Sequence, residues 1–130
     1  NWLVKGEEVQ PNVPGILPRV NSGNAGNRLG LAEWLVAPEN PLTARVIVNR
    51  FWANIFGIGL VETLEDFGTQ GAKPVNQPLL DWLAVQFKSE YKWSVKTLLK
   101  KIVLSATYQQ SAATNIAKLD QDANNQLFTN

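Results

Sequence analysis

Three polar side chains in the segment NPLTARVIVNRFW could bind an anion. Arg45 and Arg50 lie on either side of Asn49 in this segment. Two guanidinium groups could form a fork for a carboxylate or a sulfate, because guanidinium binds planar anions through paired hydrogen bonds. The structural alternative is that Arg50 pairs with Glu65 or Asp66 and holds the loop that follows. The sequence leaves both alternatives open.

Three carboxylates lie close together in the next segment, at Glu62, Glu65 and Asp66. Glycoside hydrolysis uses two carboxylates about 5 to 9 Å apart, and this chemistry needs no histidine. Acidic neighbours also serve as helix caps or as solvated turn residues, and a sequence gives no distance between their carboxyl groups. Catalysis by this group is therefore one hypothesis, and a structural role is the other.

Tryptophan is frequent in this chain, which has five. The helical patterns predict that Trp52 and most of Trp34 pack in the core, whereas Trp82 and Trp93 fall at the edge of their apolar stripes or outside them. An exposed indole can stack on a sugar ring or form part of a partner surface. We therefore expect Trp82 and Trp93 to be the better interface candidates.

Carbohydrate recognition combines such stacking with polar groups that bind hydroxyls. Trp82 would supply the aromatic face, and Asp66, Gln70 and Arg50 would supply the polar contacts. Carbohydrate binding or processing is the second function that the sequence suggests. Together with the anion fork, this hypothesis gives six candidate binding residues: Arg45, Asn49, Arg50, Asp66, Gln70 and Trp82. No catalytic residue and no metal ligand is predicted.

Composition excludes several kinds of chemistry. The chain has no His and no Cys, so imidazole catalysis, thiol catalysis, thiolate metal sites and covalent haem attachment through Cys are excluded, and no cofactor is expected in this chain. Its net charge of +1 gives no electrostatic reason to expect nucleic acid or an anionic membrane as a partner. No apolar run approaches the roughly 20 residues that cross a bilayer. The chain also lacks Met and a visible signal peptide, which suggests a piece of a longer protein.

Helical periodicity predicts the elements that hold these residues. Apolar residues recur three and four positions apart in four segments, and Pro or Gly follows two of them. Asn76 and Ser94 are suited to cap the third and fourth helices, and Gly57 is suited to end the second in a left-handed conformation. Thr63 and Asp66 could cap a single helical turn. The four predicted helices are residues 28–37, 42–56, 77–89 and 95–109.

The predicted fold class is all-α: a compact bundle of about four irregularly crossing helices with an extended N-terminal arm. The arm covers residues 1–27, where Pro and Gly interrupt any helix, and its apolar residues, such as Ile16 and Leu17, suggest that it lies on the core. Leu31, Ala32 and Leu35 are expected to form the apolar face of the first helix. The helical core covers 28–111, and the polar segment 112–130 is expected to be loop with a weak helical start.

Several long strings resemble one protein family. They are RLGLAEWLVAPENPLTARVIVNRFWANIFGIGLV, EDFGTQG, LLDWLAVQF and KKIVLSATYQQSA, which cover about two-thirds of the chain. In order and spacing they resemble the C-terminal domain of planctomycete cytochrome c-associated proteins, the PSD-one family of unknown function. The matching positions are Asn40, Pro41, Arg45, Asn49, Arg50, Phe56, Gly57, Gly59, Asp66, Phe67, Gly68, Gln70, Gly71, Asp81 and Trp82.

This resemblance implies a domain of a larger exported bacterial protein, periplasmic or otherwise extracytoplasmic, with haem in an upstream domain. It supplies no catalytic residues. The chain has Asn76-Gln77-Pro78 where the family usually has His-Pro-Glu, and it stops before the family's last helices. The leading hypothesis is a non-catalytic helical interaction module that contacts other domains of its polypeptide or protein partners. Glycans are the alternative ligand, and neither nucleic acid binding nor membrane insertion is expected.

Overall fold

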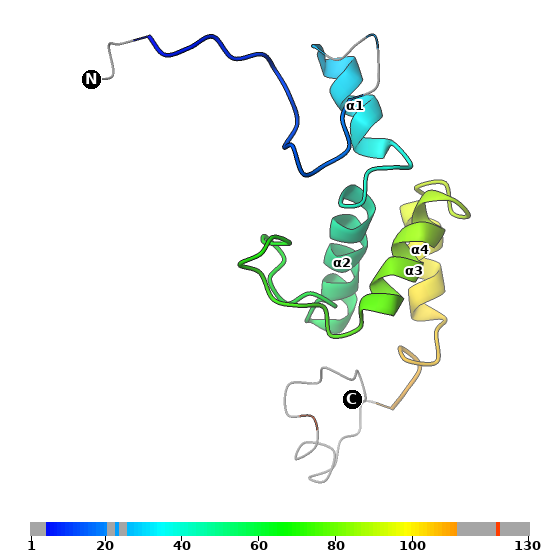
Figure 1. Cartoon of the computed structure of the whole chain (residues 1–130). Helices are drawn as coiled ribbons and strands as arrows, with labels where there is room; N and C mark the ends of the chain where they lie inside the picture. Colours follow the sequence, from blue (N-terminus) through cyan, green and yellow to red (C-terminus); the bar gives the residue numbers. More distant parts are fainter. Residues whose placement is uncertain (1–4, 21–22, 24–25, 112–121, 123–130) are drawn as a thin grey trace. The chain divides into compact units, whose positions relative to one another are not determined.

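The computed structural model describes residues 5–20, 23, 26–111 and 122. Contacts divide the chain into two units, residues 1–43 and residues 44–130, which are described separately below. The described part is helical and contains no strand, so the predicted all-α class is confirmed (Figure 1). None of these helices has the length and apolar character needed to span a bilayer. The helices are α1 (Arg28–Val36), α2 (Thr43–Phe56), α3 (Gln77–Lys88) and α4 (Val95–Val103).

The second unit has one hydrophobic core, which lies between α2, α3 and α4. Along α2, Ala44, Val48 and Trp52 are buried at intervals of four residues, as the sequence predicts. The predicted stripes of α3 and α4 meet this face, and the turn before α4 adds Tyr91. The largest fully buried apolar side chains are Val48, Leu60, Val61, Leu80, Phe87 and Leu98.

Three predicted helix ends are confirmed. The Asn76 side chain accepts a hydrogen bond from the Leu79 backbone N–H at the start of α3, and Ser94 accepts one from Thr97 at the start of α4. Gly57 ends α2 with φ of 83°, a left-handed conformation that glycine adopts without steric cost. These local signals set the starts of α3 and α4 and the end of α2.

The buried face of α1 differs from the predicted one. Leu31 and Leu35 are 49% and 40% exposed, and Gly30 is the buried residue of this helix. The Trp34 indole N–H donates to the carbonyl of Pro18 at 2.7 Å, which turns the face that contains Gly30 and Trp34 toward that segment. A tryptophan N–H usually finds a hydrogen-bond acceptor when its ring is packed against other residues, and this contact holds that face of α1 against Pro18.

The N-terminal arm is described from residue 5 onward. Residues 5–14 and 18–20 form no regular element, and a turn joins the Leu17 N–H to the Pro14 carbonyl. Ile16 is 92% exposed within the first unit, and packing of the arm on the core of the second unit stays a prediction. The apolar residues at positions 2–4 lie outside the described residues, as do the C-terminal residues 112–121 and 123–130.

Helix α4 ends six residues before the predicted end, at Val103 instead of residue 109. The Ser105 hydroxyl accepts a hydrogen bond from the Tyr108 N–H, which offers the backbone an alternative to a continued helix. Leu104 is 59% exposed, so another helical turn at this position would bury little apolar surface. The chain therefore continues as a series of turns up to residue 110.

Candidate functional site

The buried side chain of Asn49 ties α2 to the loop that follows it. Its Nδ2 donates to the Val61 carbonyl at 2.9 Å, and its Oδ1 accepts from the Val61 N–H at 2.8 Å. Asn49 is fully buried, so this amide pair replaces the partners that both polar groups of Val61 would otherwise find in water. A Cβ on Gly59 would stand 2.5 Å from the Val61 carbonyl oxygen, so glycine makes this close approach possible.

The pairing of Arg50 with Glu65, one of the sequence alternatives, is present. The Nη2 of Arg50 donates to both Glu65 carboxylate oxygens, at 3.3 and 3.2 Å. Both side chains are largely exposed, at 52% and 86%. The pair joins α2 to the loop at the surface, where an ion pair contributes little to stability.

Asp66 and Thr63 organise the same loop, but their side chains do not cap the single helical turn that the sequence predicts. The Asp66 carboxylate accepts from the Gly68 N–H at 2.7 Å. The Thr63 hydroxyl donates to the Asp66 carbonyl and accepts from the Ala72 N–H, so it joins two parts of the loop. No helix follows Thr63, and its hydroxyl is therefore used across the loop instead of at a helix start. Gln70 is exposed in this loop.

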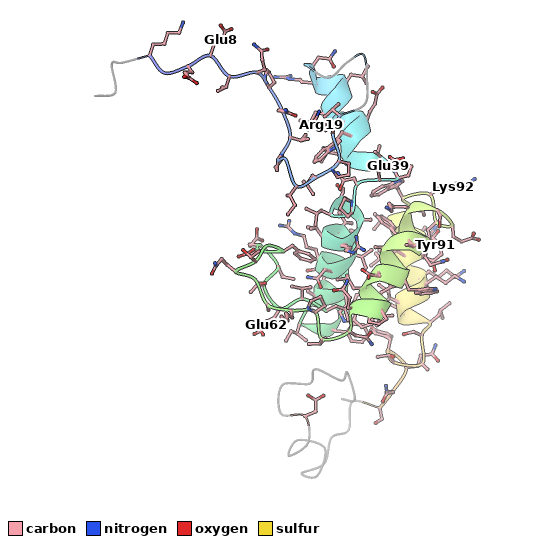
Figure 2. The ribbon with its side chains drawn as sticks, in the orientation of Figure 1. Glu8, Arg19, Glu39, Glu62, Tyr91 and Lys92 are labelled. Atoms are coloured by element: carbon pink, nitrogen blue, oxygen red, sulfur yellow. The ribbon has the colours of Figure 1, made fainter. Side chains whose placement is uncertain are left out.

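The three acidic side chains of the loop, Glu62, Glu65 and Asp66, have different surroundings. Glu65 faces Arg50, Asp66 faces Gly68, and Glu62 is exposed at the outer side of the loop (Figure 2). Within the ranges that the structure describes, no group of three or more acidic side chains lies close enough to hold a metal ion.

Arg45 contacts α3 instead of the loop. Its Nε donates to Asp81 Oδ1 at 2.6 Å, and the same oxygen accepts from the Gln77 amide at 2.7 Å. The hydrogen bond from Arg45, followed by that from Gln77, holds the pKa of the Asp81 carboxyl below its usual value. Arg45 and Arg50 therefore pair with carboxylates on different elements, and the structure does not bring them to one anion.

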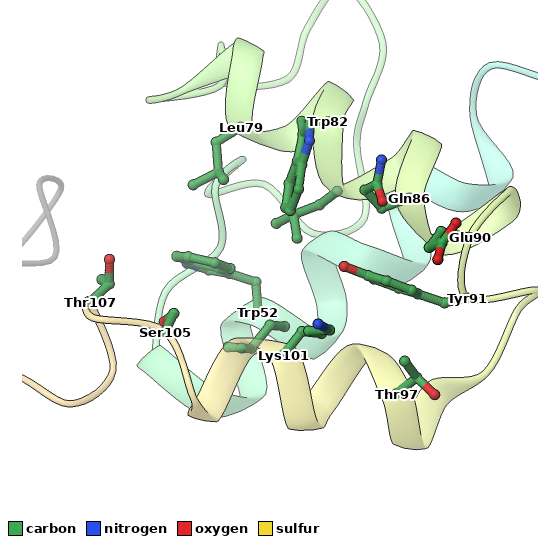
Figure 3. A pocket seen from close by; sticks show the side chains of 12 residues that line it. Trp52, Leu79, Trp82, Gln86, Glu90, Tyr91, Thr97, Lys101, Ser105 and Thr107 are labelled. Carbon is green, nitrogen blue, oxygen red and sulfur yellow. The ribbon is translucent and has the colours of Figure 1, made fainter.

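A groove of about 580 Å³ lies along α3 and α4. Trp82, Gln86 and Glu90 line one side, and Thr97 and Lys101 line the other (Figure 3). Trp82 is 53% exposed, so much of its indole surface is open to a ligand. The other lining residues are Trp52, Leu79, Leu83, Tyr91, Ile102, Ser105 and Thr107.

In the turn between α3 and α4, the aromatic side chains of Tyr91 and Trp93 line different hollows of the surface. Lys92 and Trp93 both have positive φ, at 46° and 62°. The Trp93 N–H donates to the Phe87 carbonyl, and its ring meets the Phe87 ring edge-on at 5.2 Å. Trp93 lines a second hollow with Arg50, whereas Tyr91 lines the α3–α4 groove. Figure 2 shows Tyr91 and Lys92 in this turn.

The six sequence candidates therefore do not form one site. Trp82 lines the α3–α4 groove, and Arg50 lines the second hollow, which is about 500 Å³. Asp66 bonds within the loop, and Asn49 is enclosed in the core. The four residues proposed for carbohydrate contact, Arg50, Asp66, Gln70 and Trp82, are not gathered around a common hollow.

The polar lining of the groove is what the sequence reasoning missed. Trp82, Gln86 and Glu90 follow one another at intervals of four residues on α3 and beyond its end, and Thr97 and Lys101 do the same on α4. Residues four positions apart share a helix face. The sequence therefore shows a polar stripe beside the buried stripe of each helix. Nothing in the sequence shows that the polar stripe of α3 faces the polar stripe of α4.

Comparisons with known proteins identify a family. No curated protein and no solved structure matches this chain significantly. The family model described as PSD1, protein of unknown function (DUF1553), matches residues 27–130. This match covers well over half of the chain and agrees with the resemblance carried by the sequence strings. The chain belongs to the PSD1 family of proteins of unknown function.

Proposed function

We propose that this chain is a non-catalytic helical binding module of a larger exported, cytochrome c-associated bacterial protein. Its α3–α4 groove would hold the partner, and haem would belong to an upstream domain. The partner would be another domain of the same polypeptide, a separate protein or a glycan. The exported setting and the haem domain rest on the resemblance, and the binding role rests on the groove.

The observation that carries this proposal is the exposed indole of Trp82 in a groove with an apolar floor. Trp82 is 53% exposed, whereas Leu83 beside it is 4% exposed and belongs to the core. Tryptophan is enriched at the centres of binding sites, because its large ring gains much contact area on binding. The groove volume of about 580 Å³ also lies in the range of about 300–1,000 Å³ that is typical of ligand sites.

The other candidate residues support a binding role over a catalytic one. Arg45, Asn49, Arg50 and Asp66 each bond a group of the fold. Side chains held in this way serve to position α2, α3 and the loop. Carbohydrate processing by these residues is therefore less well supported than binding in the groove.

A binding assay with two matched variants tests the proposal. Trp82→Ala removes the groove indole, and Val85→Ala changes a 54% exposed residue of the same helix that does not line the groove. The analytes are the remainder of the polypeptide and a set of neutral, acidic and sulfated oligosaccharides. We expect at least one analyte to bind, and Trp82→Ala to weaken that binding about tenfold or more while Val85→Ala leaves it unchanged.

Two results would contradict the proposal. One is that no analyte binds, or that the two variants weaken binding equally. The other is chemical conversion of an analyte by the wild-type protein, which would show that the module is catalytic.

A further inference from the structure

We infer that the α3–α4 groove binds a neutral sugar ring, with Trp82 stacked on the face of the ring and the Tyr91 hydroxyl bonded to one of its hydroxyls. This inference rests on the proposed function, because it names the ligand class of the same groove. It adds Tyr91, a residue that the sequence did not single out.

Tyr91 is the first observation. The residue is 8% exposed, and Figure 3 shows its hydroxyl directed into the groove, toward the space between Trp82 and Lys101. Its backbone N–H and carbonyl are bonded to Gln86 and Ser94, but its hydroxyl makes no hydrogen bond within the described residues. The Tyr91 hydroxyl oxygen is not fully buried, so it is open to water or to a ligand. The fold therefore keeps a polar group at the base of the groove for which a ligand hydroxyl is a suitable partner.

Trp82 is the second observation. Its indole forms a flat aromatic wall above this hydroxyl (Figure 3). One face of a pyranose ring carries C–H groups, and its edge carries hydroxyls. Such a ring can place its C–H face on the indole while an edge hydroxyl reaches Tyr91. The side chains of Gln86, Glu90 and Lys101, which also line the groove, can bond the remaining hydroxyls.

The charges around the groove favour a neutral ring. Of the groove-lining side chains, Glu90 supplies one negative charge and Lys101 supplies one positive charge. With one charge of each sign, the groove offers no excess of either charge to select a sulfated or carboxylated sugar.

A purely apolar peptide anchor fits this groove less well. It would cover the Tyr91 hydroxyl and the Gln86 amide without bonding either of them. Leaving such groups covered and unbonded weakens a complex. A sugar ring satisfies these groups and still covers the indole of Trp82.

The decisive variant is Tyr91→Phe, because it removes only the hydroxyl. Since that hydroxyl makes no hydrogen bond within the described fold, we expect Tyr91→Phe to keep the wild-type melting temperature or raise it slightly. We expect the same variant to weaken binding of a neutral oligosaccharide about five- to tenfold, the usual effect of one lost hydrogen bond. Trp82→Ala should weaken it more, and Val85→Ala should have no effect.

Titration calorimetry with cello-, manno-, xylo- and chito-oligosaccharides measures these constants, and a sulfated oligosaccharide of matched length serves as the charged comparison. Two-dimensional NMR of the tryptophan indole N–H signals shows whether the bound sugar lies at Trp82, whose signal is the one absent from Trp82→Ala.

The outcomes separate this inference from the proposed function. If no neutral sugar binds, but the remainder of the polypeptide binds in a manner that Trp82→Ala abolishes, the sugar inference is wrong and the binding module stands. If nothing binds in the groove, both are wrong. A preference for the sulfated oligosaccharide, or neutral-sugar binding that Tyr91→Phe leaves unchanged, also overturns the inference.

Discussion

Replacing Asn49 with Ala should destabilise the second unit more than any substitution of a surface polar residue. Asn49 is fully buried, and Val61, which it bonds through both N–H and carbonyl, is 2% exposed. Asn49→Ala leaves both backbone groups of Val61 without this partner. Each such group costs about 1–3 kcal/mol when buried and unbonded, so two give about 2–6 kcal/mol. Loss of the asparagine's own desolvation penalty offsets part of this, which leaves about 2–4 kcal/mol.

Urea unfolding followed by circular dichroism at the helical band measures this loss. Asn54→Ala is the matched control, because Asn54 is an exposed asparagine on the same helix. It should change the free energy of unfolding by less than about 0.5 kcal/mol. In thermal scans Asn49→Ala should lower the melting temperature by roughly 8 °C or more, at about 4–8 °C per kcal/mol for a domain of 60–100 residues.

A second substitution at the same position tests the geometry of the bonds. Asn49→Asp keeps an acceptor for the Val61 N–H but removes the donor to the Val61 carbonyl. The introduced carboxyl regains that donor only when it is protonated, and burial favours its neutral form. Asn49→Asp should therefore be less destabilising at about pH 4 than at about pH 7. A loss below about 1 kcal/mol for Asn49→Ala, or no pH dependence for Asn49→Asp, would refute this account of the loop anchor.

Three further predictions concern the contacts around this anchor. Gly59→Ala should destabilise the second unit by about 1–3 kcal/mol, because the added Cβ meets the Val61 carbonyl, whereas Gly15→Ala, with nothing within 4 Å, should be neutral in the same urea experiment. Arg45→Ala should cost at most about 1 kcal/mol near pH 6, since the pair is 30% and 39% exposed. The lowered pKa of Asp81 means that this contribution is present above the unfolded value of 3.8 and is lost as the pH falls through the lower folded value, so the stabilities of wild type and Arg45→Ala should approach each other as the pH is lowered below 3.8. Arg50→Ala should change stability by less than about 0.5 kcal/mol in urea titrations at low salt, and a larger change would show that its surface pair does more than exposed pairs usually do.

The helices of the second unit could be predicted because their signals are local. The stripe of α2 and the caps at Asn76 and Ser94 each depend on residues a few positions apart. The early end of α4 was missed because a serine such as Ser105 is also found within helices. Here its hydroxyl accepts a hydrogen bond from the Tyr108 N–H, which favours a turn over a continued helix. The face of α1 was missed because its orientation depends on the contact of Trp34 with Pro18, 16 residues away. A contact between residues this far apart in the chain does not change the spacing of apolar residues within a helix, so the sequence pattern does not predict it.

The groove was harder to predict for the same reason. Trp82 was recognised as an edge residue, but its polar neighbours on α4 become neighbours only after the helices pack. Tyr91 illustrates the difficulty best, because an aromatic residue before a helix is expected to pack in the core. It does so with its ring, while its hydroxyl faces the groove. Only the structure distinguishes these two ends of one side chain.

Most groove residues lie within the strings that match the family, but of the fifteen matching positions only Trp82 lines the groove. Asn49, Gly59 and Asp66 match the family strings, and they hold the loop to α2 or shape it. Glu90 and Tyr91 lie between the matched strings, and they line the groove. Membership of the PSD1 family therefore indicates the loop and helix framework more directly than it indicates the ligand. Two family members could share this framework and bind different partners, and Tyr91→Phe is the substitution that examines binding in this chain without altering the framework.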